Sequence, residues 1–96
     1  MKNLNRVKEL ARDLRREEPR SPYEELGGEV HAARTLDKCR ATLVGQNGDF
    51  QFGCPMDRHF FEETGIGMRE FEDFVATGAS DDEVAQWIQQ HSATRR

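Results

Sequence analysis

The chain has 96 residues, of which 33% are charged and 35% hydrophobic, and its formal net charge is −4. This length suits one domain with a small core. The charge is uneven, because residues 1–20 carry seven Lys or Arg and four Asp or Glu, whereas the remainder carries seven and fourteen. An acidic body argues against general binding to nucleic acid or to a membrane surface, since both need a basic surface. No apolar run approaches the roughly 20 residues that span a bilayer.

The first predicted element is a basic helix over residues 2–16, whose apolar residues fall on one face at helical spacing. We expect this face to pack against the acidic remainder of the chain. Prolines end the helix and begin a connector over residues 17–29. Within the connector, Ser21 before Pro22 predicts one or two helical turns through Leu26, ended by a Gly-Gly pair.

A second long helix is predicted over residues 30–44, and a turn at an Asn-Gly pair follows it. A short extended or hairpin segment is expected near residues 44–52. Ser80 and Glu83 have the spacing of a capping box at the start of the last helix. Three shorter helices are predicted over residues 55–64, 68–77 and 81–91.

These elements predict an all-α protein of about five helices that forms a single domain over residues 1–96. Its helical body covers residues 30–91, and residues 92–96 form a frayed tail. The basic start lacks the apolar run of a signal peptide, so we expect a cytoplasmic protein with reduced cysteines. The thin core is compatible with a monomer or a homodimer.

Arg40 is the most unusual residue of the second helix, because it projects between Leu36 and Ala33 in the apolar arc. A buried charge without a partner is costly, so the guanidinium must be paired or reach solvent. One interpretation is an anion-binding arginine on the floor of a pocket. The other is a structural ion pair that joins two elements, with Glu24, Asp49 and Asp57 as candidate carboxylates.

Cys54 is the candidate nucleophile. It precedes Pro55 at the predicted start of a helix, where the helix dipole and free N–H groups stabilise a thiolate. His59 follows as a candidate basic neighbour. The alternative is a small helix-capping cysteine with an exposed histidine nearby. No motif of a known thiol enzyme is complete in this segment.

A metal site would require two histidines and two cysteines to converge. Their spacing matches none of the compact zinc patterns, so we predict no metal and no cofactor. A disulfide between the two cysteines is geometrically open from the sequence, but a reducing compartment disfavours it. The four residues are His31, Cys39, Cys54 and His59.

Three segments of the chain resemble the small bacterial proteins grouped as domain of unknown function 5069. They read RSPYEELGG, LDKCRATLVGQNGDFQFGCPMDRHFFEETGI and DDEVAQWI, and the resemblance extends from about Leu10 to Ile88. It rests on the L-D-K-x-R-A block, the N-G turn and the C-P-x-D segment in this order. The resemblance implies a bacterial, cytoplasmic, single-domain protein. It transfers no functional residue, because the family has no established activity, ligand or partner.

Without a complete catalytic set, we expect a non-enzymatic binding or interaction domain whose partner is a protein or a small anionic ligand. Its surface would form where the connector meets Arg40 and the loop before the third helix. The candidate binding residues are Tyr23, Arg40, Asp57 and His59. The alternative is a thiol-dependent enzyme or redox sensor that uses Cys54. A weaker option is nucleic-acid binding through the basic residues of the first helix, Arg6, Lys8, Arg12, Arg15 and Arg16.

Overall fold

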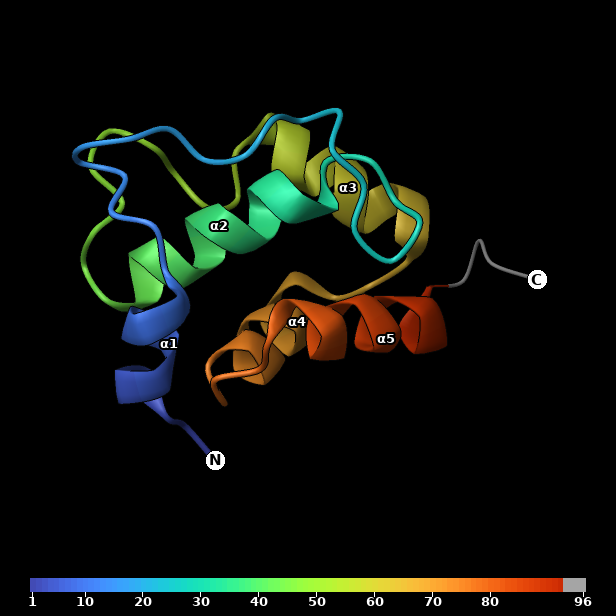
Figure 1. The fold of residues 1–96 in the computed structure, drawn as a ribbon. Helices are drawn as coiled ribbons and strands as arrows, with labels where there is room; N and C mark the ends of the chain where they lie inside the picture. Colours follow the sequence, from blue (N-terminus) through green and yellow to red (C-terminus); the bar gives the residue numbers. More distant parts are fainter. Residues whose placement is uncertain (93–96) are drawn as a thin grey trace.

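The computed structural model describes residues 1–92, which contain five helices and no strand (Figure 1). The all-α prediction is therefore confirmed. The predicted frayed tail lies, apart from Ser92, outside the described residues. The helices are α1 over Leu4–Leu10, α2 over Ala32–Leu43, α3 over Pro55–Thr64, α4 over Met68–Val75 and α5 over Asp81–His91.

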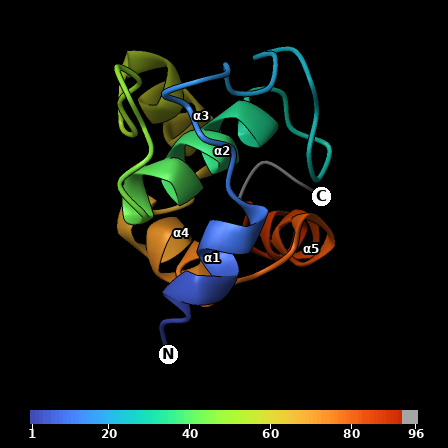
Figure 2. The ribbon, with the colours of Figure 1, turned by 60° about the vertical axis from the view of Figure 1, so that its left-hand side comes forward.

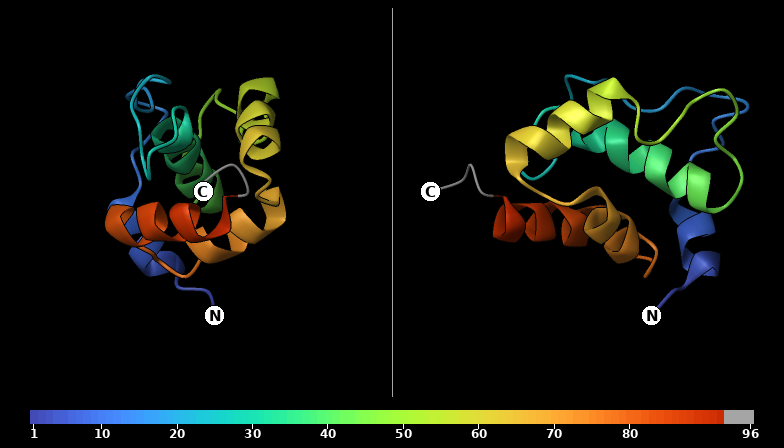
Figure 3. Two further views of the ribbon diagram at one scale, coloured as in Figure 1. Left: turned by 90° about the vertical axis from the view of Figure 1, so that its right-hand side faces the viewer. Right: turned by 180° about the vertical axis from the view of Figure 1, so that it is seen from behind.

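The helices form two layers, with α2 and α3 above α4 and α5 in Figure 1. Helix α1 stands at one end, beside the carboxyl end of α2, and Figures 2 and 3 show the same arrangement from other sides. The backbone N–H of Asn3 donates to the carbonyl of Ala76 at 2.7 Å, which ties the start of α1 to the end of α4. The connector from α1 to α2 runs along the outside of α2 to the opposite end of the molecule.

The core lies between the two layers and is dominated by aromatic rings. Phe71 of α4 contacts Phe61 of α3 edge to face at 5.4 Å between ring centroids, and it contacts Trp87 of α5 at 6.0 Å. Such edge contacts add to the free energy gained from apolar burial. The buried residues of the cluster are Ala32, Leu36, Cys39, Phe60, Phe61, Ile66, Phe71, Val75, Ala79, Val84 and Ile88.

Helix α1 is shorter than predicted, because it ends at Leu10 rather than near Arg16. Ala11 is already extended, and the N–H of Leu14 donates to the carbonyl of Gln46 at 2.8 Å instead of to its own helix. Leu14 is buried by this contact with the loop after α2. A helix continued to residue 16 would have kept that N–H for its own ladder. Tertiary packing therefore overrides the helical periodicity here.

The predicted short helix in the connector does not form. Ser21 accepts a hydrogen bond from the N–H of Tyr23 through its side chain, which closes a single turn. Leu26 and Glu29 then exchange two backbone hydrogen bonds around the two glycines, both at positive φ. A Cβ on Gly27 would lie 2.8 Å from the carbonyl oxygen of Ala85, so this turn approaches α5 too closely for a side chain.

The later helices agree with their predicted start signals. Ser80 and Glu83 form the capping box of α5, with hydrogen bonds of 3.2 and 2.8 Å. Helix α3 starts after Cys54 and stops at Gly65, which has a φ of 74°. By contrast, residues 44–52 form a loop without a hairpin. Helix α4 ends slightly early, at Val75.

Candidate functional site

Helix α2 carries three charged side chains that are buried on different sides of it. Asp37, Lys38 and Arg40 are each only 3% exposed. At 100° per residue, Lys38 points away from Arg40 by about 160°, whereas Asp37 lies on the same side as Arg40. The helix therefore presents one buried cation toward α3 and one toward α5, and each has its own partners.

Lys38 meets the start of α3, where it contacts a carboxylate and a thiol. Its Nζ lies 3.1 Å from Oδ2 of Asp57 and donates to Sγ of Cys54 at 3.0 Å. The side chains of Lys38 and Asp57 are 4% and 1% exposed. The Asp57 carboxylate also accepts hydrogen bonds from the hydroxyl of Thr35 and the backbone N–H of Gly53, at 3.0 and 2.8 Å. We call Thr35, Lys38, Cys54 and Asp57 the Cys54 cluster.

The Cys54 cluster favours the thiolate. Burial raises the pKa of Cys54, but the hydrogen bond from Lys38 and the backbone N–H of Asp57 lower it more, so that it lies below the ordinary cysteine value. Cys54 directly precedes α3, and the residue is partly exposed. An electropositive, partly accessible position at a helix start is the environment in which cysteines become reactive.

Cys39 has the opposite character. It is wholly buried in the core, and burial raises the pKa of its thiol. Both cysteines are free thiols. Cys54 is therefore the only one of the two that both reaches solvent and favours ionisation.

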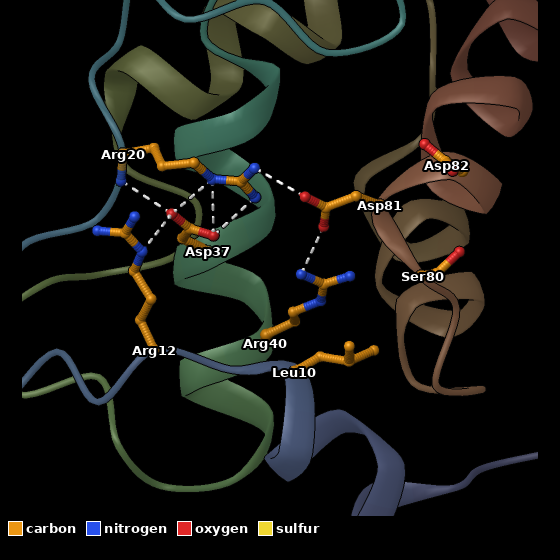
Figure 4. Close-up of a pocket in the computed structure, with 8 residues that line it drawn as sticks. All are labelled: Leu10, Arg12, Arg20, Asp37, Arg40, Ser80, Asp81 and Asp82. Atoms are coloured by element: carbon orange, nitrogen blue, oxygen red, sulfur yellow. Dashed lines mark hydrogen bonds and ion pairs between the residues drawn. The ribbon is translucent and has the colours of Figure 1, made fainter.

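Arg40 joins α2 to the start of α5 (Figure 4). Its guanidinium donates to Oδ1 of Asp81 and to the carbonyl of Ala79, at 2.8 and 2.9 Å. Arg40 therefore forms an ion pair that joins two elements, but its partner is Asp81 and not one of the candidate carboxylates Glu24, Asp49 and Asp57. Asp57 is already engaged by Lys38 on the other side of α2.

Arg20 extends this contact into a network. Its guanidinium binds Oδ2 of Asp81 and Oδ1 of Asp37, each at 2.8 Å, and its backbone N–H donates to Asp37 as well. Arg12 adds a longer contact, with its Nε 3.7 Å from Asp37. We call Arg12, Arg20, Asp37, Arg40 and Asp81 the arginine network. It borders a cavity of about 430 Å³, which Leu10, Ser80 and Asp82 also line.

The other predicted site residues lie apart from both clusters. Tyr23 is 82% exposed and lines none of the cavities described in residues 1–92. His59 is exposed, and its Nε2 lies 3.6 Å from the carboxylate of Glu63. His31 and His59 border a small cavity of about 70 Å³, into which neither cysteine projects. Within the described residues, no three His, Cys, Asp or Glu side chains are placed to hold a metal ion.

Sequence reasoning identified Cys54, Asp57 and Arg40 but missed Lys38 and Arg20. A signal for Lys38 was present, since it lies in the same buried helix as Arg40 and on its opposite side. Arg20 gave no comparable signal, because it sits in an irregular connector where no periodicity predicts burial.

None of the helices in residues 1–92 has the length and apolarity needed to cross a bilayer.

Comparison with other proteins identifies a family and leaves its activity open. No curated protein matches the chain. A family model does match it, over residues 16–96, which include α2 to α5, the Cys54 cluster and all of the arginine network except Arg12. The chain belongs to the family described as Domain of unknown function (DUF5069).

Proposed function

We propose that this protein acts through Cys54 as a reactive thiolate and serves as a thiol-based redox switch. The observation that carries the proposal is the contact of 3.0 Å between the buried ammonium of Lys38 and Sγ of Cys54 at the start of α3. An ion pair alone would need only Lys38 and Asp57. The thiol is the one group of this cluster that combines nucleophilic chemistry with partial access to solvent.

The proposed reaction is oxidation of the thiolate by a hydroperoxide. The sulfur attacks the peroxide oxygen that carries hydrogen, the O–O bond breaks, and the departing alkoxide or hydroxide takes up the proton that the thiol released to solvent when it ionised. Cysteine becomes a sulfenic acid, and the peroxide is reduced to an alcohol or water. Lys38 remains paired with Asp57 after the thiolate charge is lost, so the cluster can stay folded in both states.

This proposal takes up the alternative raised by the sequence, and the geometry favours it over the expected binding surface. That surface required the connector at Tyr23 to meet Arg40 and the loop before α3. Arg40 instead faces α5, and Tyr23 projects into solvent. A switch of this kind needs a reducing compartment, so we place the protein in a cytoplasm and, by the family resemblance, in a bacterium.

The test is the rate of Cys54 alkylation by iodoacetamide as a function of pH. A Cys39→Ala background leaves one thiol to follow. We expect a midpoint below about 8.5, the ordinary value. Replacing Lys38→Met removes the neighbouring cation and should raise the midpoint by about 1–3 pH units, whereas Lys38→Arg keeps the charge and should stay near the wild type.

Circular dichroism verifies that each variant is folded before its rate is compared. A wild-type midpoint at or above about 8.5 overturns the proposal, whatever happens to Lys38→Met. A second measurement treats the wild type with hydrogen peroxide and traps sulfenic acid with dimedone. Mass spectrometry should find the adduct on Cys54 and none on buried Cys39, and an adduct on both or on neither contradicts the proposed selectivity.

A further inference from the structure

We infer that the cavity beside the arginine network is a binding site for a small anion that carries a carboxylate or a phosphate group. The inference is independent of the thiol chemistry, because Arg40 and Lys38 project from opposite sides of α2. The cavity measures about 430 Å³, which falls within the range of about 300–1,000 Å³ typical of small-molecule sites.

Three separate parts of the chain supply the walls. Leu10 and Arg12 come from the end of α1 and the start of the connector, Arg40 from α2, and Asp81 from the first turn of α5. In Figure 4 the three arginines lie on the side of α2 and the connector, Ser80, Asp81 and Asp82 lie across from them at the start of α5, and Leu10 lies below Arg40. A ligand bound there would meet guanidinium groups on one side and the polar start of α5 on the other, with Leu10 as an apolar contact.

The three arginines that line the cavity differ in how closely a carboxylate engages them. Arg20 and Arg40 pair with Asp37 and Asp81 at 2.8 Å. The nitrogens of Arg12 lie 3.7 Å from Asp37 and 3.6 Å from Glu17, so Arg12 is the arginine held least closely by a carboxylate. Asp82 also lines the cavity, so the lining balances three arginines with three aspartates, and an anion would be recognised through hydrogen-bond donors and not through a net positive charge.

The N–H donors of these arginines, by contrast, are in excess. A guanidinium has five N–H groups, and Arg40 donates through NH1 to Asp81 and through NH2 to Ala79. Arg12 donates to the carbonyl of Glu18 at 3.0 Å, and its contact with Asp37 is longer. The guanidinium fork matches the two oxygens of a carboxylate or a phosphate. The remaining donors of Arg12 and Arg40 can therefore bind a ligand while Asp81 stays in place.

The experiment follows the arginine side-chain N–H signals of the ¹⁵N-labelled protein by NMR at low ionic strength. Separate titrations use inorganic phosphate, propionate and the neutral isostere propionamide. We expect saturable shifts of Arg12, Arg20 and Arg40 with one or both anions and none with propionamide. Phosphate alone or propionate alone identifies the oxyanion that the site prefers.

Variants decide whether the signal comes from this cavity. Arg12 is 41% exposed, so Arg12→Gln should fold, and it should weaken binding about tenfold, the loss expected for a charge-assisted hydrogen bond. The matched control is Arg15→Gln, which removes an exposed arginine paired with Asp13 and should bind like the wild type. The inference is overturned by an absence of saturation, by equal binding of propionamide, or by Arg12→Gln binding as tightly as Arg15→Gln.

Discussion

The Cys54 cluster and the arginine network lie on opposite sides of one helix, and both contain a buried cation from it. Lys38 and Arg40 are equally buried, yet their surroundings differ. Around Lys38 the carboxylate of Asp57 is almost fully buried, and the partly exposed partner is Cys54. Around Arg40 the partners border a cavity, and the more exposed groups there are the Asp81 carboxylate and the Arg12 guanidinium, at 45% and 41%. Burial alone therefore does not assign a role to a charged residue, because the role depends on which neighbouring group remains open to solvent.

Removal of the carboxylate that pairs with Lys38 should have the largest effect on stability. Asp57→Ala leaves Lys38 buried without a carboxylate and removes the acceptor for Thr35 and for the N–H of Gly53. We expect the free energy of unfolding in urea to fall by about 3–5 kcal/mol. The control is Asp73→Ala in an exposed pair on α4, which should change it by less than about 1 kcal/mol. Similar losses of stability in the two variants would show that the pair of Lys38 and Asp57 contributes no more than an exposed ion pair.

A smaller loss of stability is expected when a cation of the arginine network is removed. Arg40→Leu removes one donor to Asp81 and the donor to the Ala79 carbonyl, but Arg20 still holds Asp81. We expect a loss of about 1–3 kcal/mol in the same urea measurement. The thiol alkylation profile of Cys54 should not move. A loss as large as that of Asp57→Ala, or a shifted profile, would mean that the two clusters are coupled through α2.

Loss of the capping box tests whether the start of α5 positions Asp81 in the arginine network. Ser80 directly precedes Asp81, and Ser80→Ala removes the side-chain acceptor for the N–H of Glu83. Loss of such a cap costs about 1 kcal/mol. We expect that decrease in stability, measured by urea unfolding, together with weaker anion binding. Unchanged stability would contradict the assigned cap.

The smallest expected effect is a dependence on pH. Burial raises the pKa of Asp81, but hydrogen bonds from Arg20 and Arg40 lower it more, so the pKa lies below its ordinary value. Asp81 therefore stabilises the fold above its ordinary pKa of about 3.9, and this stabilisation disappears as the pH falls through the lower folded value. At pH 7, Asp81→Asn should lower the free energy of unfolding by less than about 1 kcal/mol, because this carboxylate is half exposed. The difference in Tm between the wild type and Asp81→Asn should shrink as the pH falls. A difference that grows instead would reverse the assigned sign.

Local signals account for most of the helical body. Gly65 and the pair of Ser80 and Glu83 predict helix ends correctly, because caps act through hydrogen bonds within one turn. The end of α1 was mispredicted, because Leu14 satisfies its backbone on a loop more than thirty positions further along the chain, at Gln46. The prediction of a short helix in the connector was wrong for the same reason, since the turn at Gly27 is shaped by its close approach to α5.

Sequence patterns were sufficient to predict that the fold is helical, that Arg40 needs a partner and that Cys54 precedes a helix. Each conclusion depends on periodicity or on neighbours within about one turn. The contact of Lys38 with Cys54 and the pair of Arg40 with Asp81 follow from the folding of the chain, since the partners are separated by 16 and by 41 positions in the sequence. A buried charge specifies that a counter-charge must be near, but many carboxylates in an acidic chain can supply it. The packing of α2 against α3 and α5 makes that choice.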